Sequence, residues 1–215
     1  SPEESCVFHF PGIQPDRLLL DFRVRGSRCD TVMSGNFVGM YKVTRYLLEK
    51  GHRDIAFVGS VLANENIMDR YYGYKKALME AGIRERKEWI LEDRDLITGH
   101  MQVTLPENMP TAFACSGDLT AQWVYEALKE KGYRIPQDIS LVGYDNYLPW
   151  HHLSQELTTY NVDMKRMAKM AVKRLLGKIR GVEKYYGTRY IDSYIVERSS
   201  VKELKPAGDG TAGHM

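Results

Sequence analysis

Short apolar runs alternate with longer segments of helical periodicity along most of this chain, and this alternation limits the folds open to it. Residues 55–59 (IAFVG) and 111–116 (TAFACS) are apolar runs of strand length, and residues 119–131 have helical spacing. Such alternation predicts an α/β fold with parallel sheets. The expected strands are 18–22, 31–34, 55–59, 111–116, 139–144, 157–162 and 190–199, and the expected helices are 36–50, 69–81, 119–131 and 164–179.

Composition and charge exclude several classes of protein. The 215 residues carry 30 basic and 28 acidic side chains, so the net charge of +2 gives no case for a nucleic-acid surface. Three cysteines in spacings that fit no zinc pattern favour a reducing compartment. No apolar run approaches the ~20 residues that a membrane span requires, and no secretory leader opens the chain. We therefore expect a cytoplasmic protein without a membrane partner.

Polar residues stand where the expected strands end. The stretch 138–146 (DISLVGYDN) is an apolar strand that ends at Asp145, and LLLDF ends at Asp21. Ser116 follows another strand and Arg70 opens a predicted helix, and ligands of open α/β sheets bind beyond the carboxyl ends of the strands. Carboxylates and a forked guanidinium suit a small polar ligand such as a sugar or nucleoside. Each residue also has a structural alternative: Asp145 starts a turn, Asp21 pairs with a nearby arginine, and Arg70 lies on the surface.

Motifs for catalysis or for metal binding are missing from the sequence. The six histidines fit no metal spacing, and there is no GxSxG, P-loop or GxGxxG motif. The pair His151–His152 is interpreted as a solvated loop, Asp118 as an N-cap or first-turn acid of the helix at 119–131, and the tyrosines near Arg70 as packing residues. We therefore expect no catalytic residues, no metal and no cofactor.

Several stretches together resemble a known family. DTVMSGNFVGMYKVTRYLLEKGHRDIAFVGS, MDRYYGYKKALMEAGI, PTAFACSGDLTAQWVYEALKEKGYRIPQDISLVGYDN and ELTTYNVD follow one another in the order seen in lactose-repressor-type (LacI/GalR) transcription factors. The similarity covers about residues 18–201. It implies a two-lobed, periplasmic-binding-protein-like (type I) fold of parallel sheets with flanking helices, with an effector in the cleft between the lobes.

The resemblance also implies site residues. Asp21, Arg70 and Asp145 match cleft residues that contact effectors, and Asn66 matches a neighbouring polar contact. Many family members have Asn before Asp in the turn that here reads Ser116-Gly117-Asp118, so Ser116 is expected to take over that contact or the effector differs from a typical hexose. Two further positions, at the last crossing into the first lobe, complete the set: Val162 and Met164.

The resemblance divides the chain between the lobes. Residues 1–34 are expected to be a remnant of a truncated first lobe, and 35–160 to form the second lobe. Residues 161–185 would cross back and add a helix to the first lobe, residues 186–204 would return to the second lobe, and 205–215 would be a disordered tail. No helix-turn-helix precedes these segments, so operator DNA would be reached through a part absent from this chain.

Two functions from different classes fit these features. The first is an effector-binding and dimerisation domain of a bacterial transcriptional regulator, with a sugar or related metabolite as effector. The alternative is a solute-binding protein of a sugar transporter, and an enzyme on this fold is a third, less favoured reading. A homodimer is expected through the helix at 119–131 and the turn at 147–150, with Trp123 in the interface unless it belongs to the core.

Overall fold

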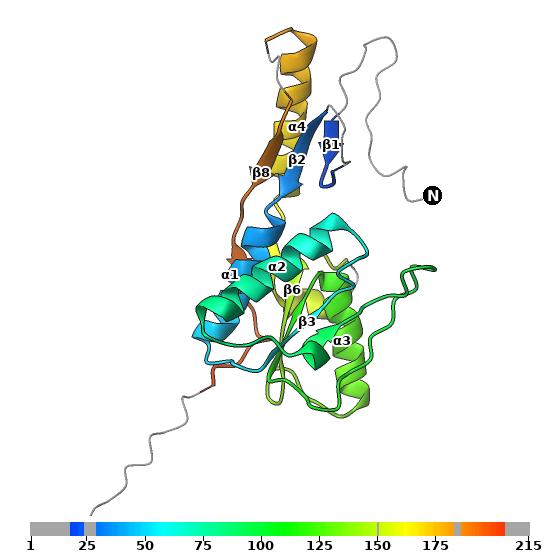
Figure 1. The fold of residues 1–215 in the computed structure, drawn as a ribbon, viewed down its shortest axis with the longest axis vertical. Helices are drawn as coiled ribbons and strands as arrows, with labels where there is room; N and C mark the ends of the chain where they lie inside the picture. The colour runs from blue at the N-terminus through cyan, green and yellow to red at the C-terminus, as the bar shows by residue number, and fades with distance from the viewer. Residues whose placement is uncertain (1–17, 24–28, 150, 183–185, 205–215) are drawn as a thin grey trace, which may run out of the picture.

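The computed structural model describes residues 18–23, 29–149, 151–182 and 186–204. The expected tail at 205–215, Trp150, and residues 1–17 of the expected first-lobe remnant lie outside the described residues. The described chain forms a six-stranded sheet and a separate three-stranded sheet. Figure 1 shows the small sheet and one helix standing at one end of the molecule and the large sheet with the remaining helices at the other.

The large sheet is parallel except at one edge. Its strand order is β4-β3-β5-β6-β7-β9, and only β9 runs antiparallel to its neighbour. This agrees with the parallel sheet predicted from the strand–helix alternation. The strands are β3 (Ile55–Val58), β4 (Ile90–Leu91), β5 (Ala112–Cys115), β6 (Ser140–Asp145), β7 (Thr158–Asn161) and β9 (Ile195–Val196).

Helices cover both faces of the large sheet. Successive strand residues point to opposite faces, so Phe57 belongs to the core beneath α1 (Asn36–Glu49) and α2 (Glu65–Glu80), whereas Val58 belongs to the core beneath α3 (Asp118–Glu130). Strands β3 and β5 are buried along their whole length. This explains why they read as continuous apolar runs rather than as alternating ones.

The small sheet has three strands. Strands β1 (Leu18–Leu20), β2 (Asp30–Ser34) and β8 (Thr188–Ile191) are all parallel, and α4 (Met164–Ile179) packs on β1 and β2. Buried charges accompany this packing: Asp30 forms ion pairs with Arg174 and, at 3.3 Å, with Lys178. The ammonium group of Lys178 also lies 3.6 Å from the centre of the Tyr186 ring.

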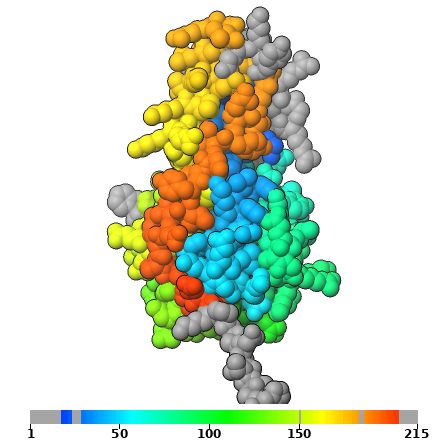
Figure 2. All heavy atoms as spheres, turned by 90° about the vertical axis from the view of Figure 1, so that its left-hand side faces the viewer, coloured from blue at the N-terminus to red at the C-terminus, as the bar shows by residue number. Residues whose placement is uncertain are grey.

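Three segments connect the two sheets. The chain crosses between β2 and α1, between β7 and α4, and between β8 and β9. The sequence predicted one strand over 190–199, but the structure has β8 in the small sheet and β9 in the large one. The interruption lies at Asp192, whose carboxylate accepts hydrogen bonds from Tyr160 at 2.6 Å and from Lys42. Figure 2 shows this segment running from the upper to the lower part beside α1.

The four helices follow their predicted positions, with one difference. Helix α2 begins at Glu65, four residues before the predicted start, because the side chain of Asn64 caps it by accepting a hydrogen bond from the backbone of Ile67 at 2.9 Å. Two short 3₁₀ helices, η1 (Lys87–Trp89) and η2 (His152–Gln155), lie in the loops. Among the helices of the described ranges, none has the length and apolar character needed to cross a membrane.

The Gly51-His52 turn after α1 holds the last described segment against the large sheet. Gly51 has φ +89°, and a Cβ there would lie 2.4 Å from the carbonyl oxygen of Leu204. The fully buried His52 ring lies 2.9 Å from the hydroxyl of Thr111 and 3.1 Å from the carbonyl oxygen of Lys202. Burial lowers the pKa of His52. This motif therefore has a structural role in the chain.

Candidate functional site

The small sheet contributes Asp21 to the junction between the two sheets. Asp21 follows β1 with φ 60°, and its Oδ1 atom accepts hydrogen bonds from the backbone nitrogen and the hydroxyl of Ser34 at 2.8 and 2.7 Å. Its carbonyl oxygen accepts a hydrogen bond from the Asn66 amide at 2.6 Å. Asn66 lies in the first turn of α2, so this contact joins the small sheet to a helix of the large one.

Arg70 is buried at the centre of the junction. Its Nε atom donates to Oδ1 of Asn36 at 2.8 Å, Nη1 donates to the carbonyl oxygen of Ser116, and Nη2 lies 3.4 Å from Oδ1 of Asp145. The guanidinium also lies 3.9 Å from the centre of the Tyr144 ring. Only 7% of Arg70 is exposed, so the alternative of a surface arginine is wrong.

Asp145 is the carboxylate that faces this arginine. It is the last residue of β6 and has φ 114°. Burial raises the pKa of Asp145 to about 7 against the opposing effect of Arg70, with Asp118 and Asp21 adding to the rise. The side chain is 38% exposed, so the carboxylate can be reached from solvent. Asp145 therefore combines a raised pKa with access from outside.

Gly117 leaves space beside Asp145. A Cβ at this position would lie 3.3 Å from Oδ2 of Asp145, closer than ordinary van der Waals contact. No hydrogen bond or ion pair is recorded at Oδ2 within the described residues. The glycine that departs from the family pattern thus keeps an acceptor atom of the candidate site uncovered.

Asp118 connects the segments that surround the candidate site. Its carboxylate accepts hydrogen bonds from the hydroxyl of Thr159 at 2.6 Å and from the backbone nitrogen of Tyr147 at 2.8 Å. Burial raises the pKa of Asp118 to about 6, opposed by these hydrogen bonds. Of the two predicted positions, the structure places Asp118 in the first turn of α3 and Gly117 at the N-cap. The Asp118 side chain joins α3, β7 and the loop after β6.

Ser116 contacts Arg70 through its backbone only. Its hydroxyl lies 3.4 Å from Asp93 and 3.3 Å from the hydroxyl of Thr120, in a separate buried cluster. Burial opposes ionisation of Asp93, but hydrogen bonds from Arg94, Thr120 and the Ser60 backbone outweigh it and lower the pKa of Asp93. The Ser116 hydroxyl is thus engaged with this cluster.

The two residues expected at the last crossing into the first lobe are placed differently from each other. Val162 is buried, and its backbone nitrogen donates to the carbonyl oxygen of Asp145 at 3.1 Å. Met164 begins α4 with 60% of its surface exposed. The structure therefore brings together five of the seven candidate side chains or their backbones, adds Val162 at their edge, and leaves the Met164 side chain in solvent. The five are Asp21, Asn66, Arg70, Ser116 and Asp145.

Three residues of the junction were missed from the sequence. Ser34 and Asn36 connect Asp21 to Arg70, since the Ser34 hydroxyl that donates to Asp21 also lies 3.2 Å from the Asn36 oxygen that accepts from Arg70. The Tyr144 ring lies beneath Arg70 and stacks on Tyr160 at 5.0 Å. Asn36 and Gly39 stand in the pattern Asn-x-x-Gly at the start of α1. Gly39 has its own role, because a Cβ there would lie 2.7 Å from both rings.

The arrangement is suited to binding a small polar ligand. It offers carboxylate acceptors, a fixed guanidinium and an aromatic face, the groups that select a small polar ligand. Within the described residues, no group of three His, Cys, Asp or Glu side chains could hold a metal ion. The site lies where the strand ends of both sheets meet (Figure 1).

Comparison with known proteins gives consistent similarities. Residues 44–201 match the family of periplasmic binding protein-like domains. The chain is similar to the HTH-type transcriptional repressor PurR of Erwinia tasmaniensis and to that of Yersinia pestis, with 37% identity over 183 residues in each case. Each match covers 83% of this chain and 54% of the relative. The chain thus spans about half the length of these curated relatives.

Solved structures show the same fold. A transcriptional regulator LacI from Bacillus cereus subsp. cytotoxis has a TM-score of 0.73 and 26% identity, covering 87% of this chain and 68% of its own. A LacI family transcriptional regulator from Enterococcus faecium with bound ribose has a TM-score of 0.69 and 25% identity, covering 87% and 71%.

Proposed function

Because the chain belongs to the family of periplasmic binding protein-like domains, we propose that it is the effector-binding domain of a bacterial transcriptional regulator. The resemblance to lactose-repressor-type regulators is confirmed by the curated and structural similarities. The alternative of a transporter's solute-binding protein is not favoured, because the curated relatives are repressors. Operator DNA would be bound through a helix-turn-helix outside this chain, and the regulator would work in the cytoplasm.

The single observation that carries the proposal is the position of Arg70. Its guanidinium is held at once by the start of α1 through Asn36, by the residue after β5 through Ser116, and by the end of β6 through Asp145. The small sheet reaches the same cluster through Asp21. A ligand that contacts this cluster would contact both lobes, taken as the units built on the two sheets. Binding one lobe arrangement better than another would then shift the population between them.

The ligand class follows from the chemistry of the cluster. Its open acceptor is the Asp145 carboxylate, which suits a ligand with hydroxyl or N–H donors. The regulator from Enterococcus faecium was solved with ribose, a small molecule of that kind. We take a neutral sugar, nucleoside or related metabolite as the effector.

Calorimetry with a panel of sugars and nucleosides, including D-ribose and adenosine, tests the site. Arg70→Ala should weaken the binding of a panel member by about 1.5–3 kcal/mol, the range for hydrogen bonds to charged groups. Arg45→Ala is the matched control, because Arg45 is a partly exposed arginine of α1 that pairs with Glu49 one turn away. Equal affinities of the two variants would contradict the role of Arg70, and a panel without any binder would contradict the ligand class.

Self-association is proposed through the outer face of α3. Trp123 is 40% exposed and Leu119 52%, so Trp123 does not belong to the core. Tyr147, 72% exposed, lies in the loop held against α3 by the Asp118 hydrogen bond. Together they form an apolar surface on one side of the large sheet, of the kind that a two-fold interface covers.

Sedimentation at micromolar concentration tests this surface. We expect a dimer with an interface of about 1,200–2,000 Å² in total, and Trp123→Asp should shift it to the monomer. Val172→Asp is the control, since Val172 is an exposed apolar residue on α4. A dimer that is unchanged in Trp123→Asp would place the interface elsewhere.

A further inference from the structure

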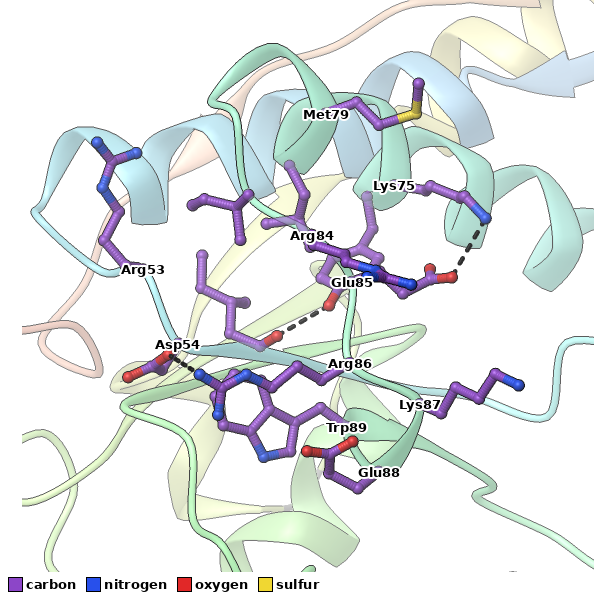
Figure 3. Close-up of a pocket in the computed structure, with 14 residues that line it drawn as sticks. Arg53, Asp54, Lys75, Met79, Arg84, Glu85, Arg86, Lys87, Glu88 and Trp89 are labelled. Carbon is purple, nitrogen blue, oxygen red and sulfur yellow. Dashed lines mark hydrogen bonds and ion pairs between the residues drawn. The ribbon is translucent and has the colours of Figure 1, made fainter.

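A hollow of about 890 Å³ lies at the opposite end of the large sheet from the Arg70 cluster. It is lined by the start of β3, the last turns of α2, and residues 83–89 that lead into η1. Ligand sites typically occupy about 300–1,000 Å³. Figure 3 shows the charged side chains around its rim.

The floor of the hollow is apolar and aromatic. Tyr74 and Leu78 of α2 line it together with Ile55 and Trp89, and each of these side chains is at most 5% exposed. The Tyr74 hydroxyl donates to the Ile55 carbonyl oxygen at 2.8 Å, and the Trp89 indole donates to the carbonyl oxygen of Asn108 at 2.8 Å. The floor therefore keeps a fixed shape and offers no unpaired polar atom from these two rings.

The rim has more cations than acids. Five basic side chains line the hollow against three acidic ones. Lys75 pairs with Glu85 at 3.2 Å, and Arg86 pairs with Asp54 at 3.6 Å while lying over the Trp89 ring at 4.3 Å. In the part of the chain that the structure describes, no ion pair is recorded for Arg53, Arg84 or Lys87, and Glu88 is the one lining acid without a recorded pair. The hollow thus keeps a positive excess.

The two arginines without ion pairs come from different segments. Arg53 precedes β3 and Arg84 follows α2, and Figure 3 shows them on opposite sides of the hollow with apolar side chains between them. A guanidinium binds carboxylate and phosphate groups through two parallel hydrogen bonds. An anionic group beside either arginine would leave the rest of the molecule over the apolar floor.

We propose that this hollow is a second binding site, for a small organic anion that joins a phosphate or carboxylate group to a planar apolar body. The anionic group pairs with Arg53 or Arg84, and the body lies against the accessible side chains of Met79 and Ile83, above the buried aromatic floor. The site is separate from the junction between the sheets, so its occupant and the effector do not compete for the same atoms.

Calorimetry on the whole chain with phenyl phosphate and benzoate tests the proposal. Both probes should bind, and inorganic phosphate and phenol should each bind at least tenfold more weakly, because each lacks one of the two parts. The double variant Arg53→Gln/Arg84→Gln should weaken phenyl phosphate binding by about tenfold or more, the scale of a lost charge-assisted hydrogen bond. Arg45→Gln is the matched control and should leave binding unchanged.

Urea unfolding separates loss of a site from loss of the fold. Arg53 and Arg84 are exposed and make no recorded ion pair, so the double variant should unfold at the same urea concentration as the parent protein. No binding of either probe at millimolar concentration would overturn the proposal. Inorganic phosphate that binds as well as phenyl phosphate would overturn the apolar part, and a double variant with parental affinity would overturn the role of the arginines.

Discussion

The two sheets of this molecule are stabilised in different ways. The large sheet is covered on both faces, and its central strands bury apolar side chains toward α1 and α2 on one side and toward α3 on the other. The small sheet has α4 as the only helix packed on it within the described residues, and charged side chains take part in that packing. Asp30 is 2% exposed and Arg174 7% exposed, with Lys178 beside them.

This difference predicts which kind of substitution destabilises each sheet. A two-sided apolar core tolerates the loss of one polar contact, because dispersion and burial are spread over many residues. A buried ion cluster depends on every member, since removing one leaves the others uncompensated in a setting of low polarity. The small sheet should therefore respond to changes of charge, and the large sheet to changes of volume.

The largest effect is expected from Asp30→Asn. The substitution leaves Arg174 and Lys178 without their carboxylate and should destabilise the small sheet by about 3–5 kcal/mol. Hydrogen exchange should show lost protection in β2 and α4, with β5 and β6 unchanged. Asp138→Asn is the control, because its pair with Arg134 is a surface contact worth at most about 1 kcal/mol. Equal loss of protection in both sheets would mean that they unfold as one unit.

A smaller effect is expected where the two units meet. Gly39→Ala would place a methyl group 2.7 Å from the Tyr144 and Tyr160 rings, and such overpacking typically costs about 1–3 kcal/mol. Gly35→Ala is the control, because its nearest contacts would be at 3.7 Å. Urea denaturation measures both. Equal stability of the two variants would show that the rings move aside without cost.

The smallest effect is a dependence on pH through Asp118. An aspartate side chain has a pKa near 3.9 in the unfolded chain. In the folded protein, burial raises the pKa of Asp118 to about 6. The folded state therefore holds the proton more tightly between these values, and stability from this group is lost as the pH rises from about 4 to about 6. Asp118→Asn should remove that part of the slope in urea midpoints taken at half-unit steps. An identical slope in the variant would assign the titration to other groups.

The fold could be predicted from the sequence to a large extent, because its signals are local. Apolar runs of strand length and glycines after each helix depend on neighbouring residues, and so does the Asn64 cap that moved the start of α2. The split of 190–199 into β8 and β9 could not be predicted. It depends on contacts between Asp192 and residues more than 30 positions away, Tyr160 and Lys42.

The candidate site was predicted only in part, because some of its signals are local and others depend on contacts between distant residues. Strand-end acids such as Asp21 and Asp145 are visible in the sequence, and so is Arg70 at the start of a predicted helix; the family resemblance then assigned all three to the cleft. Asn36 and Tyr144 were missed because their importance comes from packing against Arg70 across the fold. Ser116 was expected to use its hydroxyl, but a strand residue points its side chain and its carbonyl in different directions, and here the carbonyl faces Arg70.

The three segments that cross between the sheets act together as a mechanical joint. A single connection would let one sheet turn freely over the other, whereas three connections resist twisting and sliding and leave bending as the easiest motion. The crossing at Asp192 is fastened to α1 through Lys42 and to β7 through Tyr160, so the joint is anchored to the large sheet. A molecule bound at the junction would therefore act mainly on the bending angle between the two sheets. A domain attached to the small sheet would rotate with that sheet.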